Sequence, residues 1–309
     1  MKIKRIKWAD HPILGNLELD LTNSTSGNAY DTIIFAGENG IGKSTILEDV
    51  STFLNIGSFE YFDYLEYEVA GSNYRAIQLD PPHQTIKDFF RIDNLTGTIT
   101  PVLSNRNNNR QSIDSDTLDP RHYGCVFSRA RSDFKTKSIK STGTSSLDQD
   151  KYDNDQNDDF TSLKQLIVDL QNQDYSEYSE LNRTLGSSPQ SWEQYYPNSK
   201  ISRFKDSFDN FFEQIEFDKV SDENGEKSIL FSKNGNAISI DKLSTGEKQI
   251  VFRGIYLLKN MNNLTGSIIM IDEPEISMHP KWQQRILKYF KDLFFDNGNQ
   301  IAQLFFATH

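Results

Sequence analysis

The sequence predicts an α/β fold with a mixed sheet, an antiparallel β portion and a partly disordered insertion. An apolar run at 31–36 leads through a glycine-rich loop into a segment with helical spacing of apolar residues at 45–54. A second apolar run, 267–271, ends in two carboxylates. Residues 61–80 instead contain two strand-like runs around Gly71, which predict an antiparallel hairpin. Short apolar strands that alternate with helices are typical of α/β proteins.

The remaining expected elements follow from short apolar runs and from periodicity. Expected strands are 2–8, 14–21, 95–103, 123–128 and 301–307, with a hairpin formed by 228–231 and 237–240. Expected helices are 163–170, 201–215, 246–260 and 280–295.

We expect three segments along the chain. They are an N-terminal lobe at 1–103, an insertion at 104–200 and a C-terminal lobe at 201–309. The insertion begins with a polar stretch at 104–118 that predicts a loop. At 141–160 the apolar content is low, and we expect this part to be disordered.

Composition and charge exclude several classes of protein. The 309 residues are 36% hydrophobic, and no apolar run approaches the roughly 18 residues that would span a bilayer. The basic start of the chain lacks the apolar core of a secretion signal. Cys125 is the single cysteine, so an intrachain disulfide is excluded and a cytoplasmic location is expected. A net charge of −11 disfavours binding of nucleic acid through bulk electrostatics.

A local charge pattern interrupts the acidic balance. Residues 121–140 hold six basic side chains against Asp133, a local charge of +5, and residues 148–159 hold a compensating −5. We interpret the two stretches as a solvated loop with offsetting charges, since charge runs are usually solvated. The alternative is a local contact with nucleic acid or with a partner protein. The basic side chains are Arg121, Arg129, Arg131, Lys135, Lys137 and Lys140.

The glycine-rich loop 37–44 has the spacing G-x-x-x-x-G-K-S of a phosphate-binding loop. Glycines let backbone N–H groups point at phosphate, and the following helix N-terminus adds positive potential. We expect Lys43 to reach the β- and γ-phosphates of ATP and the Ser44 hydroxyl to ligate Mg²⁺. The flanking strand and helix disfavour the alternative, a chance match in a turn. The expected nucleotide contacts are Asn39, Gly40, Gly42, Lys43, Ser44 and Thr45.

Two adjacent carboxylates, Asp272 and Glu273, follow the apolar run at 267–271. Ligands of parallel α/β sheets bind outside the carboxyl ends of the strands, so both carboxylates are expected at the nucleotide. We expect Asp272 to hold Mg²⁺ through water and Glu273 to polarise the attacking water as general base. A purely structural role is the alternative.

The segment Leu243–Gln249 has the sequence L-S-T-G-E-K-Q and precedes an expected helix. It resembles the signature of ATP-binding cassette (ABC) ATPases, in the variant L-S-x-G-E-x-Q of the branch that includes the SMC and RecF proteins. The resemblance implies that Ser244 and Gly246 act in trans, on the γ-phosphate of ATP held by another subunit. The alternative is a serine that only caps its own helix.

The segment Phe305–His309 is an apolar run that ends in Thr-His. It resembles the ABC switch region, which implies that His309 contacts the γ-phosphate and acts in catalysis with Lys43 and Glu273. Phosphate loop, signature, acidic strand end and histidine follow one another in the ABC order, unlike the order in AAA+ ATPases, G proteins and kinases. The resemblance implies an ABC-type P-loop NTPase whose homodimer, or a higher oligomer, sandwiches ATP with Mg²⁺.

The glutamine of the ABC Q-loop has no clear counterpart. Gln78, Gln84 and Gln111 are candidates, but none follows a clean apolar strand. The strand expected at 123–128 ends instead in a basic segment, Ser128–Arg131, which we interpret as occupying the Q-loop position.

The segment 273–280 has the form Glu-Pro-Glu…His-Pro and resembles that of RecF-like and OLD-like ATPases. Together with 8–17 it resembles the antiphage Septu (PtuA-like) ATPases, including those encoded with retrons, which implies an HNH nuclease as partner. The resemblance covers about 1–56 and 201–309, and the long coiled coil of some repair ATPases is missing. An ABC lobe normally continues past its switch histidine, which leaves open whether the natural chain extends beyond His309.

These features favour an ATPase that acts as a nucleotide-gated dimer in antiphage defence and regulates a nuclease. One alternative is a repair or DNA-clamp ATPase that binds DNA directly with a salt-dependent affinity. Another is a slow-turnover scaffold that holds ATP and partners. The acidic balance favours the first and third hypotheses over the second.

Overall fold

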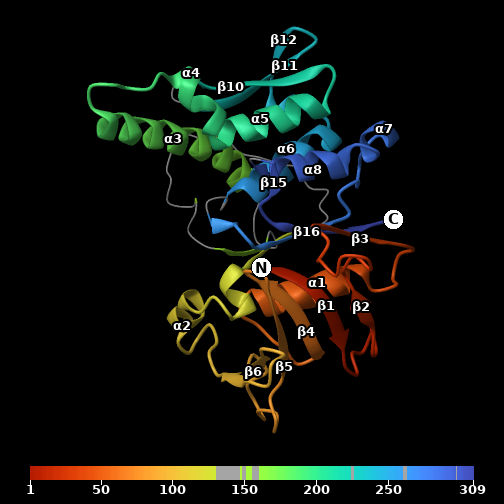
Figure 1. The fold of residues 1–309 in the computed structure, drawn as a ribbon. Helices are drawn as coiled ribbons and strands as arrows, with labels where there is room; N and C mark the ends of the chain where they lie inside the picture. Colours follow the sequence, from red (N-terminus) through yellow and green to blue (C-terminus); the bar gives the residue numbers. More distant parts are fainter. Residues whose placement is uncertain (130–146, 148–150, 155–159, 224–225, 260–262, 297) are drawn as a thin grey trace.

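A computed structural model of the chain contains a central parallel sheet between two lobes (Figure 1). The lower lobe in Figure 1 is N-terminal and holds an antiparallel sheet, whereas the upper lobe is mainly helical. The structure describes residues 1–129, 147, 151–154, 160–223, 226–259, 263–296 and 298–309.

The central sheet has five strands in the order β3, β16, β13, β8 and β9, and every neighbouring pair is parallel. The register pairs Asp272 with Ala307 and Thr308 with Ala36, so the carboxyl ends of the strands lie close together. This is the edge at which parallel α/β sheets bind ligands. The strands are β3 (Thr32–Ala36), β8 (Cys125–Ser128), β9 (Tyr152–Asn154), β13 (Ile268–Asp272) and β16 (Gln303–Thr308).

Side chains of the central sheet fill two separate cores. Ile268 and Met270 of β13 pack into the core of the N-terminal lobe, while Ile269 and Ile271 pack into the core of the C-terminal lobe. They alternate because successive side chains of a strand point to opposite faces. A strand that is buried on both faces is a continuous apolar run in the sequence, which is why β13 was predicted.

One apolar core of the N-terminal lobe joins α1 (Lys43–Leu54), the central sheet and a six-stranded antiparallel sheet. The predicted hairpin around Gly71 is confirmed as β4–β5, and the expected strand at 95–103 contains β7. Within the predicted loop 104–118 the structure has a short helix, α2 (Arg110–Ser115), which η1 (Pro120–Tyr123) follows. In spatial order the strands are β2 (Glu18–Asp20), β1 (Lys2–Trp8), β4 (Phe62–Val69), β5 (Ser72–Gln78), β6 (Phe90–Asp93) and β7 (Ile99–Val102).

The C-terminal lobe covers the other face of the central sheet, and residues 160–200, expected in the insertion, pack into its core. Its helices are α3 (Phe160–Leu185), α4 (Trp192–Tyr195), η2 (Tyr196–Asn198), α5 (Lys200–Phe211), η3 (Ile240–Lys242), α6 (Thr245–Leu258), α7 (Pro280–Gln283) and α8 (Ile286–Leu293). Its strands are β10 (Ile215–Glu223), β11 (Glu226–Lys233) and β12 (Asn236–Ser239) in one antiparallel sheet, with β14 (Phe295–Asp296) and β15 (Asn299–Gln300) in another. The expected hairpin at 228–240 is confirmed as β11–β12.

The short helix expected at 163–170 is wrong in length, since α3 has 26 residues. Its apolar pattern stops near Leu170 because the following turns are largely exposed. Asp174 gives one reason for the longer helix: its carboxylate accepts the N–H groups of Lys200 and Ile201 at 3.0 and 2.9 Å and so caps α5. Burial raises the pKa of Asp174 to about 6.

Two other expected helices end earlier than the pattern predicts. The helix expected at 201–215 stops at Phe211, because Phe212 is extended and packs against Trp282 from a loop. The helix expected at 280–295 is divided into α7 and α8. Most of the stretch 141–160, expected to be disordered, lies outside the described residues. Within the described ranges no helix is both long and apolar enough to cross a membrane.

Candidate functional site

The loop 37–44 joins β3 to α1 at the carboxyl edge of the central sheet. Gly40 and Gly42 have φ angles of 85° and 99°, a backbone conformation that residues other than glycine rarely adopt. Gly42 also lies against Leu14, and a Cβ there would approach the Leu14 Cδ2 to 2.6 Å. The tip at Asn39 and Gly40 is exposed.

Two side chains at the start of α1 point into the site. Lys43 is only 8% exposed, and its Nζ donates to the carbonyl oxygens of Gly37 (2.7 Å) and Glu38 (2.9 Å). The Ser44 hydroxyl donates to Asp272 Oδ2 at 2.9 Å and to Oδ1 at 3.1 Å. The structure therefore brings together the two residues expected to hold Mg²⁺, although 228 positions separate them in the sequence.

The chemistry of Asp272 and Ser44 suits a magnesium ion that is shared with a substrate. Burial raises the pKa of Asp272 and the charge of Glu273 adds to this, while the hydrogen bond from Ser44 opposes it. Mg²⁺ is usually held by one or two carboxylates together with water and substrate phosphates. No cluster of three His, Cys, Asp or Glu side chains that could hold a metal ion occurs within the described ranges. A carboxylate and a hydroxyl beside a phosphate-binding loop fit this shared arrangement.

The predicted base and the predicted switch histidine lie next to each other. Glu273 Oε1 is 3.1 Å from His309 Nε2, and their side chains are 26% and 43% exposed. The N–H of Glu273 donates to the carbonyl of Ala307 at 2.8 Å, which joins the end of β13 to β16. The carboxylate thus lies at the same edge as Ser44 and Asp272.

Glu275 is a functional candidate that the sequence analysis treated only as part of a family pattern. Its Oε1 accepts hydrogen bonds from the Thr308 hydroxyl (2.6 Å) and from the His309 N–H (3.0 Å). The carboxylate therefore holds the main chain that carries the histidine. The repeat of Glu on both sides of Pro274 was the available signal.

Arg253 is a second residue that sequence reasoning missed. It lies in α6, is 5% exposed, and donates to the carbonyl oxygen of Glu273 at 2.9 Å. It also donates to the carbonyl oxygens of Asp272 and Arg129, the latter at 2.7 Å. An arginine amid the apolar residues of an expected helix was the only signal, and such a residue is commonly exposed.

The signature segment forms a capping box at the start of α6. The Ser244 hydroxyl accepts the N–H of Glu247 at 3.4 Å, and the Ser244 N–H donates to Glu247 Oε2 at 2.7 Å. Within the part of the chain that the structure describes, no hydrogen bond joins Ser244 or Gly246 to the loop 37–44. The structural alternative, a serine that caps its own helix, therefore describes the single chain, and the contacts in trans stay a prediction.

Gly246 is buried by the segment that follows β13. A Cβ at this position would lie 2.9 Å from the Ser277 carbonyl oxygen and 3.2 Å from Cζ3 of Trp282. Gly246 thus has a packing role within one chain, whatever it does toward a nucleotide.

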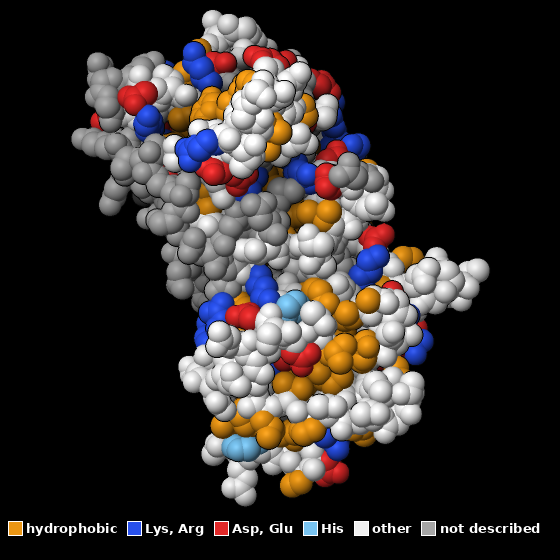
Figure 2. All heavy atoms as spheres, turned by 60° about the vertical axis from the view of Figure 1, so that its left-hand side comes forward, with side chains coloured by type: hydrophobic (Ala, Val, Ile, Leu, Met, Phe, Trp, Pro, Cys, Tyr) orange, Lys and Arg blue, Asp and Glu red, His pale blue; other side chains and the backbone are white. Residues whose placement is uncertain are grey.

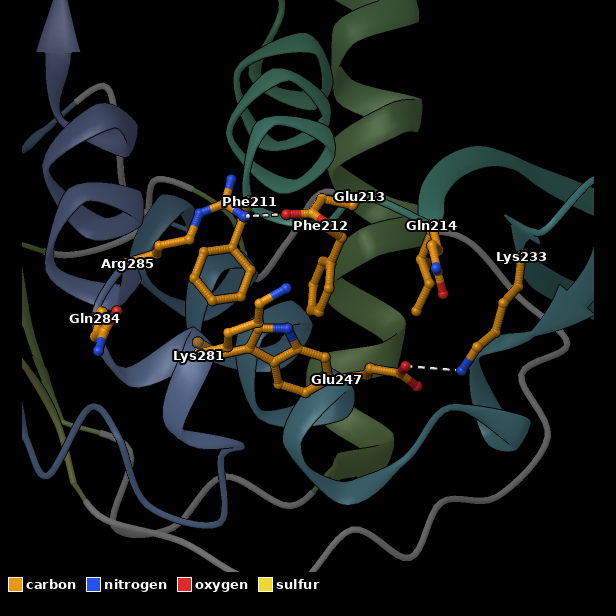
Figure 3. Close-up of a pocket in the computed structure, with 11 residues that line it drawn as sticks. Phe211, Phe212, Glu213, Gln214, Lys233, Glu247, Lys281, Gln284 and Arg285 are labelled. Carbon is orange, nitrogen blue, oxygen red and sulfur yellow. Dashed lines mark hydrogen bonds and ion pairs between the residues drawn. The ribbon is translucent and has the colours of Figure 1, made fainter.

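A pocket of about 440 Å³ lies beside the signature segment (Figure 3). The aromatic side chains Phe211, Phe212 and Trp282 line it, and the ion pairs Lys233–Glu247 and Arg285–Glu213 lie at its sides. None of the loop 37–44 lines this pocket, so it is separate from the candidate nucleotide site.

The prediction that the basic side chains of 121–140 are solvated is wrong for Arg121. This side chain is fully buried, paired with Asp119 at 2.8 Å, and donates to the carbonyl oxygen of Ser104. Arg129 follows β8 and pairs with Glu48 of α1, the helix that begins at the phosphate-binding loop. The Q-loop role of this segment stays a prediction. On the face in Figure 2, Lys and Arg side chains are interspersed with Asp and Glu. The other basic residues, Arg131, Lys135, Lys137 and Lys140, lie outside the described residues.

The strand order and the site define the class: the chain has an ABC-type P-loop NTPase fold, with its phosphate-binding loop and acidic strand at one sheet edge. Residues 33–309 match the AAA_21 family, described as "AAA domain, putative AbiEii toxin, Type IV TA system". The match spans most of the chain, which therefore belongs to this family. The chain carries the ABC order of motifs within it.

Two curated relatives are similar over short segments. The "Retron Vc95 probable ATPase" of Vibrio cholerae serotype O1 biovar El Tor is 39% identical over 71 residues, 20% of this chain and 14% of the relative. The "Retron Ec83 probable ATPase" of Escherichia coli is 36% identical over 80 residues, 22% of this chain and 15% of the relative. The aligned parts thus span less than one sixth of these relatives. The resemblance to Septu ATPases stays a prediction.

Two solved structures are similar over the whole chain at low identity. One is the SmcHead bound to the C-winged helix domain of ScpA, with 13% identity, a TM-score of 0.49 and coverage of 100% of this chain and 90% of that chain. The other is a dimeric ATP-binding cassette in a post-hydrolysis state with ADP and phosphate, with 14% identity, a TM-score of 0.37 and coverage of 100% and 87%. At these scores neither likeness bears on function.

Proposed function

We propose that this chain hydrolyses ATP at the carboxyl edge of the central sheet, with ATP on the loop 37–44 and Mg²⁺ at Ser44 and Asp272. The observation that carries the proposal is the contact of the Ser44 hydroxyl with both carboxylate oxygens of Asp272, at 2.9 and 3.1 Å. This contact joins the phosphate-binding loop to the acidic strand end. Glu273 and His309 lie at the same edge.

Each side chain has a role that its position supports. Lys43, whose ammonium group lies within the loop, neutralises charge on the β- and γ-phosphates. Glu273 accepts a hydrogen bond from the attacking water and directs it in line with the leaving group. His309 orients the Glu273 carboxylate and stabilises charge on the γ-phosphoryl group. Ser44 and Asp272 would hold Mg²⁺, which would supply neutralisation of the phosphate charge.

The proposed active form is a cytoplasmic homodimer in which Ser244 and Gly246 of one copy complete the site of the other. Ser244 is exposed at the start of α6, and helix N-termini with free N–H groups bind phosphate. Its hydrogen bonds within the chain are to Glu247 and, through its carbonyl, to the Lys248 N–H, both on its own helix. Ser244 is therefore available to a phosphate that another copy of the chain presents.

In biological terms the proposed role is antiphage defence, with ATP binding and hydrolysis gating a nuclease partner of the HNH class. The relatives named as retron ATPases support this kind of system. A DNA-clamp function has less support, because Arg121 is buried and Arg129 is paired with Glu48. Purification of the tagged chain from cells that carry its neighbouring genes tests the role. A copurifying nuclease supports it, and copurifying nucleic acid alone favours the clamp.

Glu273→Gln tests the chemistry. We expect the turnover number to fall by about 100-fold or more, because general acid–base catalysis contributes about 10²–10⁴-fold. ATP binding should persist, and the dimer should accumulate in gel filtration with ATP. Glu213→Gln is the matched control, since this glutamate has a 70% exposed side chain outside the site. Wild-type turnover and an unchanged oligomeric state of Glu273→Gln would falsify the proposed mechanism.

A further inference from the structure

Arg253 connects the signature helix to the two strand ends that frame the candidate site. Its guanidinium donates to the carbonyl oxygens of Glu273 (2.9 Å), Arg129 (2.7 Å) and Asp272. Its Nε donates to the Ser128 hydroxyl at 3.1 Å. One buried side chain of α6 thus holds the carboxyl ends of β8 and β13 together.

The main chain at Glu273 gives this connection a consequence for catalysis. Glu273 has a φ of 44°, in the left-handed region that residues other than glycine rarely adopt. Such a conformation persists only where the surroundings hold it. Three hydrogen bonds do so: the Glu273 N–H donates to the Ala307 carbonyl, and the Glu273 carbonyl accepts from Arg253 at 2.9 Å and from the Ile276 N–H at 3.2 Å. The direction of the carboxylate depends on this main-chain geometry.

We propose that Arg253 is a positioning residue that fixes the direction of the Glu273 carboxylate and transmits movement of the signature helix to it. The proposal rests on the ATPase function proposed above. Helix α6 runs without a break through 14 residues, and Arg253 lies nine positions, or about 14 Å, beyond the Ser244 cap. A phosphate that binds at Ser244 and shifts α6 also shifts the guanidinium, and with it the main chain of Asp272 and Glu273.

Arginine suits this task better than lysine. A guanidinium offers five N–H donors in a planar fork, whereas an ammonium group offers three donors at one point. The acceptors of Arg253 lie at the carboxyl ends of two different strands, β8 and β13. Arg253→Lys keeps the charge but cannot reach both strand ends in the same way.

The first test compares turnover with affinity in Arg253→Lys and Arg253→Met of the full chain. We expect the turnover number to fall by about 100-fold for Met, since misplacement of a catalytic group by about 1 Å has an effect of that order, and by less for Lys. ATP affinity measured without Mg²⁺ should change by less than about threefold, because the phosphate-binding loop, unlike the main chain of Asp272, is untouched. Arg285→Met is the control, since Arg285 also donates to a carbonyl, that of Asn210 at 2.7 Å, away from the strand ends.

The second test asks whether Ser244 acts through Arg253. Ser244→Ala is measured alone and combined with Arg253→Lys, which also carries the test where the Met variant fails to fold. We expect the loss caused by Ser244→Ala to be much smaller in the Arg253→Lys background, because coupled residues are not additive. Additive losses, or wild-type turnover of Arg253→Lys, overturn the proposal for Arg253 alone. A wild-type chain that binds ATP but never hydrolyses it overturns the proposed function itself.

Discussion

The phosphate-binding loop and the signature segment both lie at helix N-termini, yet the chain surrounds them with different groups. At the start of α1, Ser44 contacts Asp272, and Glu273 pairs with His309 at the same edge. At the start of α6, Ser244 contacts Glu247 of its own helix. The start of α1 receives the carboxylates of β13, whereas the start of α6 is capped by Glu247 of its own helix, which pairs with Lys233 of β11.

This difference indicates what turns a helix N-terminus into a catalytic site. The N–H groups of a helix start attract phosphate in either place. Water activation and metal binding need carboxylates, and the parallel sheet delivers Asp272 and Glu273 to the start of α1 through β13. Under the proposed dimer, the signature segment meets such groups when a second copy presents them.

The largest expected effect comes from replacing Lys43, which should abolish ATP binding at the loop 37–44. Lys43→Ala removes the ammonium group that lies within the loop. We expect the dissociation constant for ATP to rise by about 100-fold or more, because truncating one partner of a charged contact costs about 2–5 kcal/mol. Calorimetric titration with ATP and Mg²⁺ measures this. Lys87→Ala, an exposed residue of the N-terminal lobe, is the control and should bind like the wild type.

If the start of α6 completes the site of another copy, two inactive variants should restore activity when they are mixed. Lys43→Ala and Ser244→Arg should each be inactive as homodimers. A mixture in equal amounts puts half of the chains into mixed dimers, each with one intact composite site, so about a quarter of wild-type turnover should return. Steady-state ATPase assays of the separate and mixed proteins measure it. Turnover of the mixture equal to the mean of the separate proteins would show that the site does not need a second copy.

The strands and motifs of the candidate nucleotide site could be predicted from the sequence, but the hydrogen bonds that hold them together could not. β13 and β16 are apolar runs buried on both faces, and β3 is a short apolar run at the edge of the sheet. Their adjoining motifs have fixed spacing, so all three strands could be predicted. Arg253 and Glu275 could not, because most of the partners of Arg253 and one of the two of Glu275 are main-chain groups of distant segments. A backbone carbonyl leaves no mark in a sequence, and only the folded chain identifies it as an acceptor.

The same limit applied to packing and to helix length. Gly246 was assigned to a nucleotide from its motif, whereas the contact with Trp282 depends on how the segment after β13 turns back onto α6. The length of α3 was missed because its later turns lack an apolar face, although Asp174 there caps a helix far along the chain.

A smaller effect is expected at Gly246, where packing and nucleotide binding make different predictions. Gly246→Ala should lower the free energy of unfolding by about 1–2 kcal/mol, because overpacking costs about 1–3 kcal/mol and the gain in helix propensity offsets up to about 1. Urea denaturation measures the change. The exposed neighbour Thr245→Ala should stay within about 0.5 kcal/mol of the wild type. A stable Gly246→Ala protein that has lost only its ATPase activity would assign the glycine to the nucleotide alone.

The smallest effect concerns Glu275, which belongs to the first site only through the main chain of His309. Glu275→Gln keeps the acceptor oxygen but removes the charge that strengthens the bonds from Thr308 and the His309 N–H. We expect the weaker hydrogen bonds to raise the free energy of activation by about 1 kcal/mol. This corresponds to roughly a fivefold lower turnover number with KM unchanged.

His309→Ala shows whether this effect passes through the histidine. In that background Glu275→Gln should lower the turnover number much less, since both changes remove the same orientation of the imidazole beside Glu273. Glu213→Gln, an exposed glutamate elsewhere, should leave turnover unchanged in either background. If Glu275→Gln reduced turnover equally with and without His309, the carboxylate would act on the end of β16 as a whole. The polar groups around α1 would then include some that contact the nucleotide and others that only stabilise the end of β16.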